Sequence, residues 1–507
     1  MLRFASVSVA SLFVGVATAS AAPFEYGVSA GEITPTSAML WARAGAPGPV
    51  TAELLRGGNV VQRRTATAGR ASDLTIRVTV RGLVPGTRYT YRFRRGRTSS
   101  PAGSFRTAPA ARTATTVEFA ISGDADGTPT RPGGPPAFNR FQVYTAMVEE
   151  RNAFNVNYGD TIYSDSSVGG NPVARTVQQK WAKYKQNLSL RPLTALRAST
   201  GVYSGWDDHE FINDFSRAEH GEDIYRAGRK AFLDYTPATH SSLVGLYRSF
   251  RWGRNLELFM LDGRSFRSGK ASAGGVCDNN GSPDLAPTAP QTVRNAFASL
   301  APPLARPVPP ACVAVIRDPQ RTFLGAAQYA RFTAAVARST ATFKIVVNPT
   351  PLQQFYALPY DRWEGYEAER TRLIEFLSSR VRNVLLLTTD THANMVGDVR
   401  LRTFEPPGPL DSGITEVITG PVATNTYAKE VDQLLGATGV GQAIGALFLK
   451  PAPPRGIGMQ CVALDVYSYA QVRVTSTQLT VTLKDMNGER VTDSSGEPCA
   501  PVVVTAR

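Results

Sequence analysis

Five short apolar runs of this 507-residue chain end in clusters of acidic, histidine or amide side chains. The clusters occupy residues 122–126, 159–163, 206–210, 348–349 and 389–392. The chain has only four histidines, and two of them, His209 and His392, lie in these clusters. Because ligands of αβ sheets bind at the carboxyl ends of the strands, we expect the clusters to converge on one crevice.

The residue types in the clusters indicate metal chemistry. A mixture of Asp, Tyr, Asn and His suits two cations of borderline character. A carboxylate that bridges such a pair holds the cations about 3.5–4 Å apart, and we expect Asp160 to be that bridge. His209 would stand beside them as the proton donor to a leaving alkoxide. Asp207 and Glu210 are interpreted as salt-bridge partners around the site rather than as direct ligands.

The elements that must position these clusters follow residue 109. Before it, residues 24–109 have an all-β pattern with Gly and Pro between short strands. In residues 83–93 a Pro-Gly turn precedes Tyr89, Tyr91 and Phe93, which alternate onto one face and resemble the corner of a fibronectin type III sandwich. After residue 109, β-branched runs alternate with helical stretches, and this pattern predicts a layered αβ core.

Three of the motifs together resemble a known family. Gly-Asp-Thr-Ile-Tyr at 159–163, Trp-Asp-Asp-His-Glu-Phe-Ile-Asn-Asp at 206–214 and Asp-Thr-His at 390–392 are similar to motifs of the alkaline phosphatase D (PhoD-like) branch of the calcineurin-like metallophosphoesterases. The likeness covers most of residues 117–399. It implies an α/β fold, a four-layer αββα sandwich, preceded by a small all-β domain that also occurs in the related purple acid phosphatases.

The resemblance also implies a ligand set. One metal, expected to be Fe³⁺, would be held by Asp124, Asp160, Tyr163 and His392. A second, expected to be Ca²⁺ with Zn²⁺ or Mn²⁺ as alternatives, would be held by Asp160, Asp208 and Asp390, with Asn348 as a further contributor. The first motif departs from the family, in which a Ser-Cys pair is common, because Gly123 and Asp124 stand there. Asp126 is therefore a rival of Asp124 as the first ligand.

The implied activity is hydrolysis of phosphomonoesters, phosphodiesters or both by a metal-bound hydroxide, with Asp208 and His209 as catalytic residues. The substrate is expected to be a small molecule, a lipid or a cell-wall polymer. Arg140 and Arg264 are candidates to clamp phosphate oxygens, although arginines near strand ends are more often surface or ion-pair groups. The alternative is a secreted binding or adhesion protein that retains a vestigial metal site.

Export is predicted from the first residues. Arg3, an apolar run over 5–17 and the small residues at 19–21 are typical of a signal peptide over residues 1–21. No later run is long enough to span a bilayer, so we expect a secreted protein, extracellular or periplasmic, without a transmembrane anchor. We also expect a monomer.

The remaining chain is predicted to form three units: a fibronectin type III-like sandwich at 22–110, a metallophosphoesterase domain at 111–460 with an insertion at 268–320, and a C-terminal β segment at 461–507 packed on it. Four widely spaced cysteines predict two disulfides. Pairing Cys277 with Cys312 and Cys461 with Cys499 is the simplest of three connectivities. The net charge is +14, but the cations are scattered without an aromatic stripe, which excludes a specific nucleic-acid groove.

Overall fold

The computed structural model describes residues 23–277, 288–298, 302, 306, 309–356 and 359–507. The predicted signal peptide lies outside these described residues. Among them, no helix is long and apolar enough to cross a membrane.

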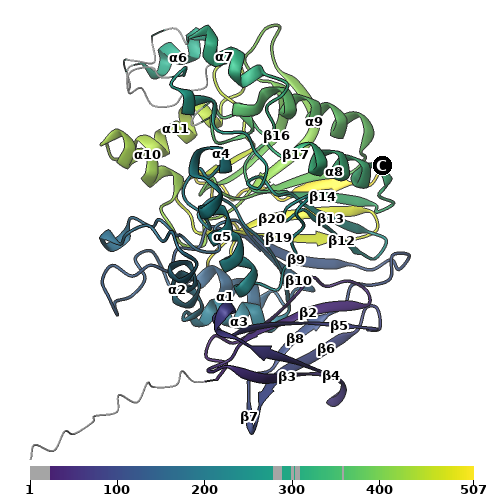
Figure 1. Ribbon diagram of the computed structural model, residues 1–507. Coiled ribbons are helices and arrows are strands. Elements are labelled where there is room, and N and C mark those ends of the chain that lie inside the picture. The colour runs from purple at the N-terminus through teal and green to yellow at the C-terminus, as the bar shows by residue number, and fades with distance from the viewer. Residues whose placement is uncertain (1–22, 278–287, 299–301, 303–305, 307–308, 357–358) are drawn as a thin grey trace, which may run out of the picture.

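The N-terminal part forms a sandwich of two antiparallel sheets, drawn in purple at the bottom of Figure 1. One sheet contains β1 (Val28–Gly31), β2 (Ser37–Arg43) and β5 (Thr75–Arg81). The other contains β3 (Gly48–Arg56), β4 (Asn59–Ala68), β6 (Arg88–Arg95), β7 (Thr98–Ser99) and β8 (Gly103–Arg106). As expected from their alternation, Tyr89, Tyr91 and Phe93 are all buried on one face of β6. The hydroxyl of Tyr89 accepts a hydrogen bond from the Val84 amide at 3.0 Å, which fixes the corner before the strand.

A six-stranded sheet forms one half of the core, in the order β11-β10-β9-β19-β20-β21. Its parallel strands are β9 (Val117–Ser122), β10 (Phe154–Tyr158) and β11 (Gly201–Gly205). The remaining strands come from the end of the chain and are β19 (Ser468–Val474), β20 (Gln478–Asp485) and β21 (Val502–Thr505). β19 pairs antiparallel with β9, from Val474 opposite Val117 to Ala470 opposite Ile121, so a strand from the end of the chain borders the first strand of the αβ core.

A seven-stranded sheet forms the other half, in the order β12-β13-β14-β15-β17-β16-β18. Its bounds are β12 (Arg248–Trp252), β13 (Leu256–Met260), β14 (Phe343–Asn348), β15 (Val384–Thr388), β16 (Asn394–Arg402), β17 (Leu410–Ile418) and β18 (Cys461–Ala463). β13, β14, β15 and β17 run parallel, so their carboxyl ends meet at one edge.

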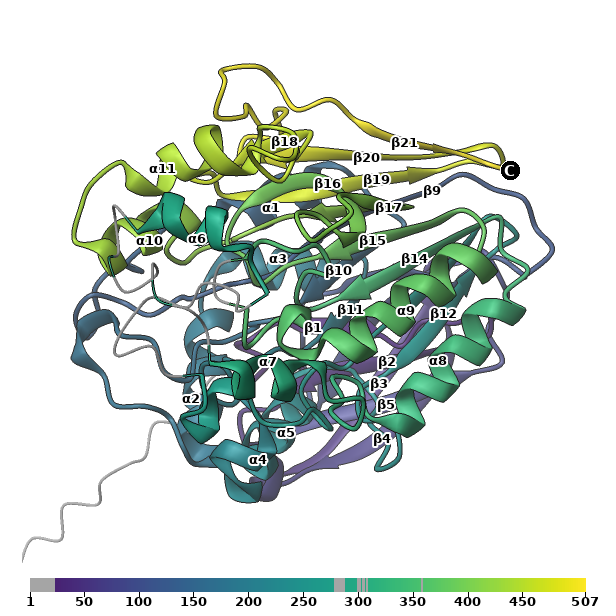
Figure 2. The ribbon, with the colours of Figure 1, turned by 90° about the horizontal axis from the view of Figure 1, so that it is seen from above.

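The two sheets pack face to face. Inward-facing residues of β9 and β10, such as Ile121 and Val156, belong to the same buried cluster as Leu258, Ile345 and Leu387 of the second sheet. The helices α1 (Gln142–Glu149), α2 (Val177–Leu188), α3 (Arg191–Ser199) and α5 (Glu222–Tyr235) share a separate apolar cluster with the outer face of the first sheet. On the second sheet lie α8 (Ala326–Arg338) and α9 (Glu367–Arg380), which run side by side in Figure 2. The expected αββα layers are confirmed.

Shorter helices surround this core. They are α4 (Arg217–His220), α6 (Gln291–Phe297), α7 (Pro310–Arg317), α10 (Tyr427–Leu435) and α11 (Val440–Ile444). Both predicted disulfides form, Cys277 with Cys312 on α7 and Cys461 on β18 with Cys499. The second disulfide joins the edge of the seven-stranded sheet to the chain just before β21 of the six-stranded sheet.

Candidate metal centre

The loops that follow β9, β10 and β15 turn sharply at their acidic and histidine residues. Asp124, Asp160, Asp390 and His392 all have positive φ, at 63°, 49°, 63° and 55°. Residues with a Cβ rarely adopt this left-handed conformation, which costs roughly 1–2 kcal/mol each. Backbone strain of this kind concentrates at functional sites, where surrounding structure enforces it. The strain therefore marks these loop tips as places where side-chain direction is closely controlled.

The turns bring one group of ligand-type atoms together at the ends of β9, β10 and β15. Donor atoms of Asp124, Asp160 and His392 lie within 4.8 Å of one another, and all three residues are buried. The hydroxyl of Tyr163 lies 2.9 Å from Nε2 of His392. Two atoms that each bind one cation at about 2.1 Å and at right angles are about 3 Å apart, so this spacing fits a shared ion.

Three further groups extend the same cluster, one of which is made of Asp208, Asp214 and Asp361. The other two include residues of the sequence motifs. Asp160, Asp208 and His209 form one, and Asp207, Asp208 and Asp390 form the other, each with ligand atoms within 4.8 Å. Asp160 thus belongs to two neighbouring groups, which is the arrangement that a bridging carboxylate requires.

Three carboxylate oxygens in this cluster are buried without a hydrogen-bond partner. They are Oδ2 of Asp124, Oδ2 of Asp160 and Oδ1 of Asp208. A buried charged oxygen without a partner is costly, and such groups in native proteins are normally paired or bind metals. The residues present therefore fit a centre of more than one cation.

The electrostatics of the cluster agree with this fit. Burial raises the pKa of Asp124 to about 7, and burial together with neighbouring carboxylates raises the pKa of Asp390 well above its usual range. Burial likewise raises the pKa of Asp160, against a lowering effect of His209. Bound cations would favour the ionised forms of all three.

His209 is held beside these acids by a carboxylate that sequence reasoning missed. Its Nδ1 lies 2.6 Å from Oδ1 of Asp165, whose second oxygen accepts a 2.6 Å hydrogen bond from the Asn213 amide. Its ring stacks on Tyr163 at 4.1 Å, and its Nε2 lies 3.9 Å from Oδ2 of Asp160. Burial alone would lower the pKa of His209, but the surrounding carboxylates outweigh burial and raise it well above its usual value.

His392 has a similar support from a distant helix. Its Nδ1 lies 2.7 Å from Oε1 of Glu430, in the first turn of α10. This contact orients the imidazole so that Nε2 faces Tyr163 and the first group of acids. Carboxylate contacts of this kind orient metal-binding histidines in many proteins. The sequence motifs carry no signal for Glu430, which lies 38 residues further along the chain.

The two arginines that were candidate phosphate clamps lie in different surroundings. Arg264 is completely buried and makes paired 2.7 Å hydrogen bonds to both oxygens of Asp207. Its guanidinium also contacts Asp361 at 2.8 Å and lies 3.8 Å from Asp208. Arg140, in contrast, is exposed on the loop before α1 and does not line the cleft described below. Arg264 therefore belongs to a buried ion-pair network with Asp207, Asp208 and Asp361.

Two other candidates are engaged in local hydrogen bonds. Asp126 accepts from the Thr128 amide with one oxygen and from the Ser166 hydroxyl with the other. Asp124, the other candidate for the first ligand, has one carboxylate oxygen without a hydrogen-bond partner and belongs to the first ligand group. Asn348, at the end of β14, donates to the carbonyl of Thr350 and accepts from the indole of Trp363 at 3.3 Å.

Helix α2 ties the ligand loops together, a role that its sequence pattern did not reveal. Buried Asn187 accepts from the Gly127 amide and donates to the carbonyls of Ala125 and Thr161, at 2.8–3.1 Å. One side chain thus joins the loop of Asp124 to the loop of Asp160. Burial lowers the pKa of Lys180 on the same helix to about 7.

The cluster opens into a cleft of about 380 Å³. Its wall includes Tyr163, Asp208, His209, Asp390 and His392. The cleft is therefore large enough for a phosphate group with part of its substituent, directly against the ligand cluster.

Comparisons with known proteins agree with this architecture. Residues 134–482 match the family model of the PhoD-like phosphatases, and residues 8–109 match the model of their N-terminal domain. The chain is 25% identical over 431 residues to alkaline phosphatase D of Bacillus subtilis (strain 168), covering 75% of this chain and 66% of that protein, just under two thirds of its length.

Solved structures give the same picture of the fold. A structure of PhoD superposes with a TM-score of 0.70 at 22% identity, covering 95% of this chain and 89% of the other. A purple acid phosphatase from yellow lupin (Lupinus luteus) seeds superposes with a TM-score of 0.55 at 12% identity, covering 95% and 74%. The expected fold, an all-β domain before an αββα core, is confirmed.

Proposed function

Because this chain belongs to the PhoD-like phosphatase family, we propose that it is a metal-dependent phosphoesterase whose active site is the cleft at the ends of β9, β10, β11 and β15. The observation that carries the proposal is the set of three buried, unpartnered carboxylate oxygens of Asp124, Asp160 and Asp208. They face the same region as His209, the proposed proton donor. A vestigial site would not need to keep costly charged groups free of hydrogen bonds.

We propose that Asp124, Asp160, Tyr163 and His392 hold one cation, and that Asp160, Asp208 and Asp390 hold a second. The phenolate of Tyr163 favours Fe³⁺ in the first position, and the all-carboxylate second position favours a hard cation such as Ca²⁺. Two cations held by these residues would polarise phosphoryl oxygens and activate water. Asn348 remains a proposed contributor, although its amide is engaged by Trp363 and Thr350.

The protein residues would supply orientation and a proton. Asp165 holds Nδ1 of His209, which leaves Nε2 to face the cleft and to protonate the leaving oxygen of the ester. The Asp165 carboxylate, which is not among the proposed ligands, favours the protonated imidazole through this contact. Arg264 would act through Asp207 and Asp208, by fixing the loop on which His209 stands.

We further propose that both monoesters and diesters fit the cleft, and that the protein is exported. The two disulfides support export, because disulfides persist mainly in oxidising compartments.

The test is an assay of p-nitrophenyl phosphate and bis-p-nitrophenyl phosphate, with metal analysis of the same purified sample. We expect turnover of at least one ester, more than one metal ion per chain, and a visible tyrosinate-to-iron absorption band that Tyr163→Phe abolishes. His209→Ala should lower kcat by about 10²–10⁴-fold. His240→Ala is the matched control, because His240 contacts Tyr225 away from the cleft.

The outcomes separate the two functions considered from the sequence. A protein that binds metal but turns over neither ester would favour the non-catalytic binding protein. Equal rates for His209→Ala and wild type would show that His209 is not the proton donor.

A further inference from the structure

A second and larger hollow lies between the N-terminal sandwich and the catalytic domain. This interdomain groove has a volume of about 960 Å³. One wall is built from β6 and β8 of the sandwich, and the other from the turn after α1 and the first residues of β9 and β10. Because the metal cleft lies at the opposite ends of β9 and β10, the groove is about 20 Å away from it, the length of a six-residue strand.

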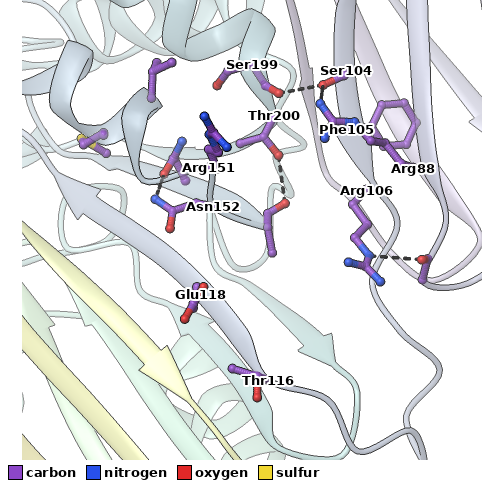
Figure 3. Close-up of a pocket in the computed structure, with 15 residues that line it drawn as sticks. Arg88, Ser104, Phe105, Arg106, Thr116, Glu118, Arg151, Asn152, Ser199 and Thr200 are labelled. Atoms are coloured by element: carbon purple, nitrogen blue, oxygen red, sulfur yellow. Dashed lines mark hydrogen bonds between the residues drawn. The ribbon is translucent and has the colours of Figure 1, made fainter.

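Three arginines face this groove from both domains. Arg88 and Arg106 come from the sandwich strands, and Arg151 comes from the turn after α1, on the facing wall in Figure 3. Each of the two sandwich arginines makes one hydrogen bond, Arg88 to the Ser104 hydroxyl and Arg106 to the Gly86 carbonyl, both at 3.1 Å. A guanidinium carries five N–H donors, so most of their donors remain available.

The charge of the groove is not neutralised by its own acids. Glu118 is the acidic residue among the lining residues, and it forms an ion pair with Arg473 at 2.9 Å. Among the described residues, no ion pair connects Arg88, Arg106 or Arg151 to a carboxylate. The groove therefore presents a net positive lining to solvent.

Arg151 occupies a backbone position at which an arginine is unfavourable. It follows the C-cap of α1 with a φ of 55°, in the left-handed region where helices usually end in Gly or Asn. An arginine at this position gives up backbone stability that a glycine would retain. Arg151 thus places a long cation at the groove at a cost in backbone stability.

We propose that the interdomain groove binds a linear chain of phosphate groups, with successive anions contacted by arginines of the sandwich and of the catalytic domain. Guanidinium groups match phosphate oxygens in bidentate geometry, and the volume exceeds what one phosphate would need. The groove would hold one part of a phosphate-bearing polymer while another part reaches the metal cleft. This anchoring role rests on the proposed phosphoesterase function, whereas the binding itself does not.

The test measures the binding of inorganic polyphosphate to the full protein by calorimetry, with orthophosphate and polyglutamate as comparison ligands. The groove variant is Arg88→Gln, Arg106→Gln and Arg151→Gln combined. The matched control is Arg331→Gln, Arg338→Gln and Arg380→Gln, which removes the same charge from exposed positions on α8 and α9. Hydrolysis of p-nitrophenyl phosphate is measured on every variant.

We expect polyphosphate to bind the wild type and the control variant alike. The groove variant should bind at least about tenfold more weakly, because each exposed charge contact contributes a few-fold. Its turnover of the small ester should be unchanged, since the arginines lie outside the metal cleft. Arg151→Gly alone should weaken polyphosphate binding while leaving Tm equal or higher, which a purely structural role of Arg151 would not produce.

Equal polyphosphate affinity of the groove variant and the control would overturn the proposal. So would orthophosphate binding as tightly as polyphosphate, which would indicate a single-anion site, or polyglutamate binding as tightly, which would indicate no preference for phosphate. If the protein bound polyphosphate in the groove but did not hydrolyse p-nitrophenyl phosphate, only the proposed function and the anchoring role would be refuted.

Discussion

Replacing Arg264 with methionine tests whether this arginine stabilises the site or contacts the substrate. Arg264 is fully buried, and both oxygens of the equally buried Asp207 receive its hydrogen bonds. Methionine keeps much of the apolar volume but leaves Asp207 as a buried charge without a partner. Asp361 would still be paired with Arg267 at 3.1 Å, so one carboxylate rather than two loses its counter-charge.

Because one buried ion pair loses one member, we expect the free energy of unfolding to fall by about 3–5 kcal/mol, the usual cost of such a change. Arg140→Met, at an exposed position, should change it by less than about 0.5 kcal/mol. The double variant Arg264→Met with Asp207→Leu should recover most of the loss, because replacing a whole buried pair by apolar groups is often nearly neutral.

The stability loss of Arg264→Met should also depend on pH. Burial already raises the pKa of Asp207, against the lowering effect of Arg264, and loss of the guanidinium raises this pKa further. A carboxylate whose pKa is raised by folding stabilises the protein at low pH and loses that contribution as pH rises through the folded pKa. The deficit of Arg264→Met should therefore be larger at pH 8 than at pH 5.

The assay is urea denaturation followed by tryptophan fluorescence, with steady-state kinetics on each variant. A stable Arg264→Met protein, less than about 1 kcal/mol below wild type, with a raised KM would refute the reasoning. That result would restore the phosphate-clamp interpretation of Arg264.

Three further predictions follow from the site and the disulfides. Glu430→Gln should weaken metal affinity about 10–100-fold through misorientation of His392, measured as metal retained after dialysis against a graded chelator; unchanged retention would contradict this role. Removal of the metals should lower Tm more at pH 8 than at pH 6. Burial raises the pKa of Asp124 to about 7, so the stability that its protonated carboxyl gives the metal-free fold is lost as pH rises through that value. An equal decrease in Tm at both pH values would argue against this reasoning. Replacing Cys461 and Cys499 with serine should lower the free energy of unfolding by about 4 kcal/mol, because the unfolded chain no longer has its 38-residue loop closed. Urea denaturation measures this loss. A loss below about 1 kcal/mol would indicate that the loop is already constrained without the disulfide.

The convergence of the acidic clusters was predictable because it depends on local sequence. Asp124, Asp160 and Asp208 follow apolar strands that run parallel in one sheet, which places these acids at one edge. Asp390 follows β15 of the second sheet and joins them because the two sheets pack face to face. The disulfide pairing was also predictable, since each cysteine pairs with its neighbour in the sequence.

The supporting contacts were not predictable, because tertiary packing decides them. Glu430 reaches His392 only through the placement of α10, and Asp361 reaches Arg264 from a loop 97 residues away. Arg264 follows β13 in the way that the acids follow their strands, and sequence alone does not reveal whether a guanidinium at such a position faces solvent or a buried carboxylate. The ligand assignments themselves remain predictions until metal analysis and mutagenesis test them.

The pairing of β19 with β9 has a consequence for how the molecule forms. During synthesis, β9 leaves the ribosome some 350 residues before Val474 completes its neighbour. Until then one edge of the catalytic sheet has no strand to cover it, and unpaired edges invite association with other chains. A newly made chain would therefore stay vulnerable to aggregation until residues 468–474 have emerged, and loss of β19 should impair assembly of the whole sheet.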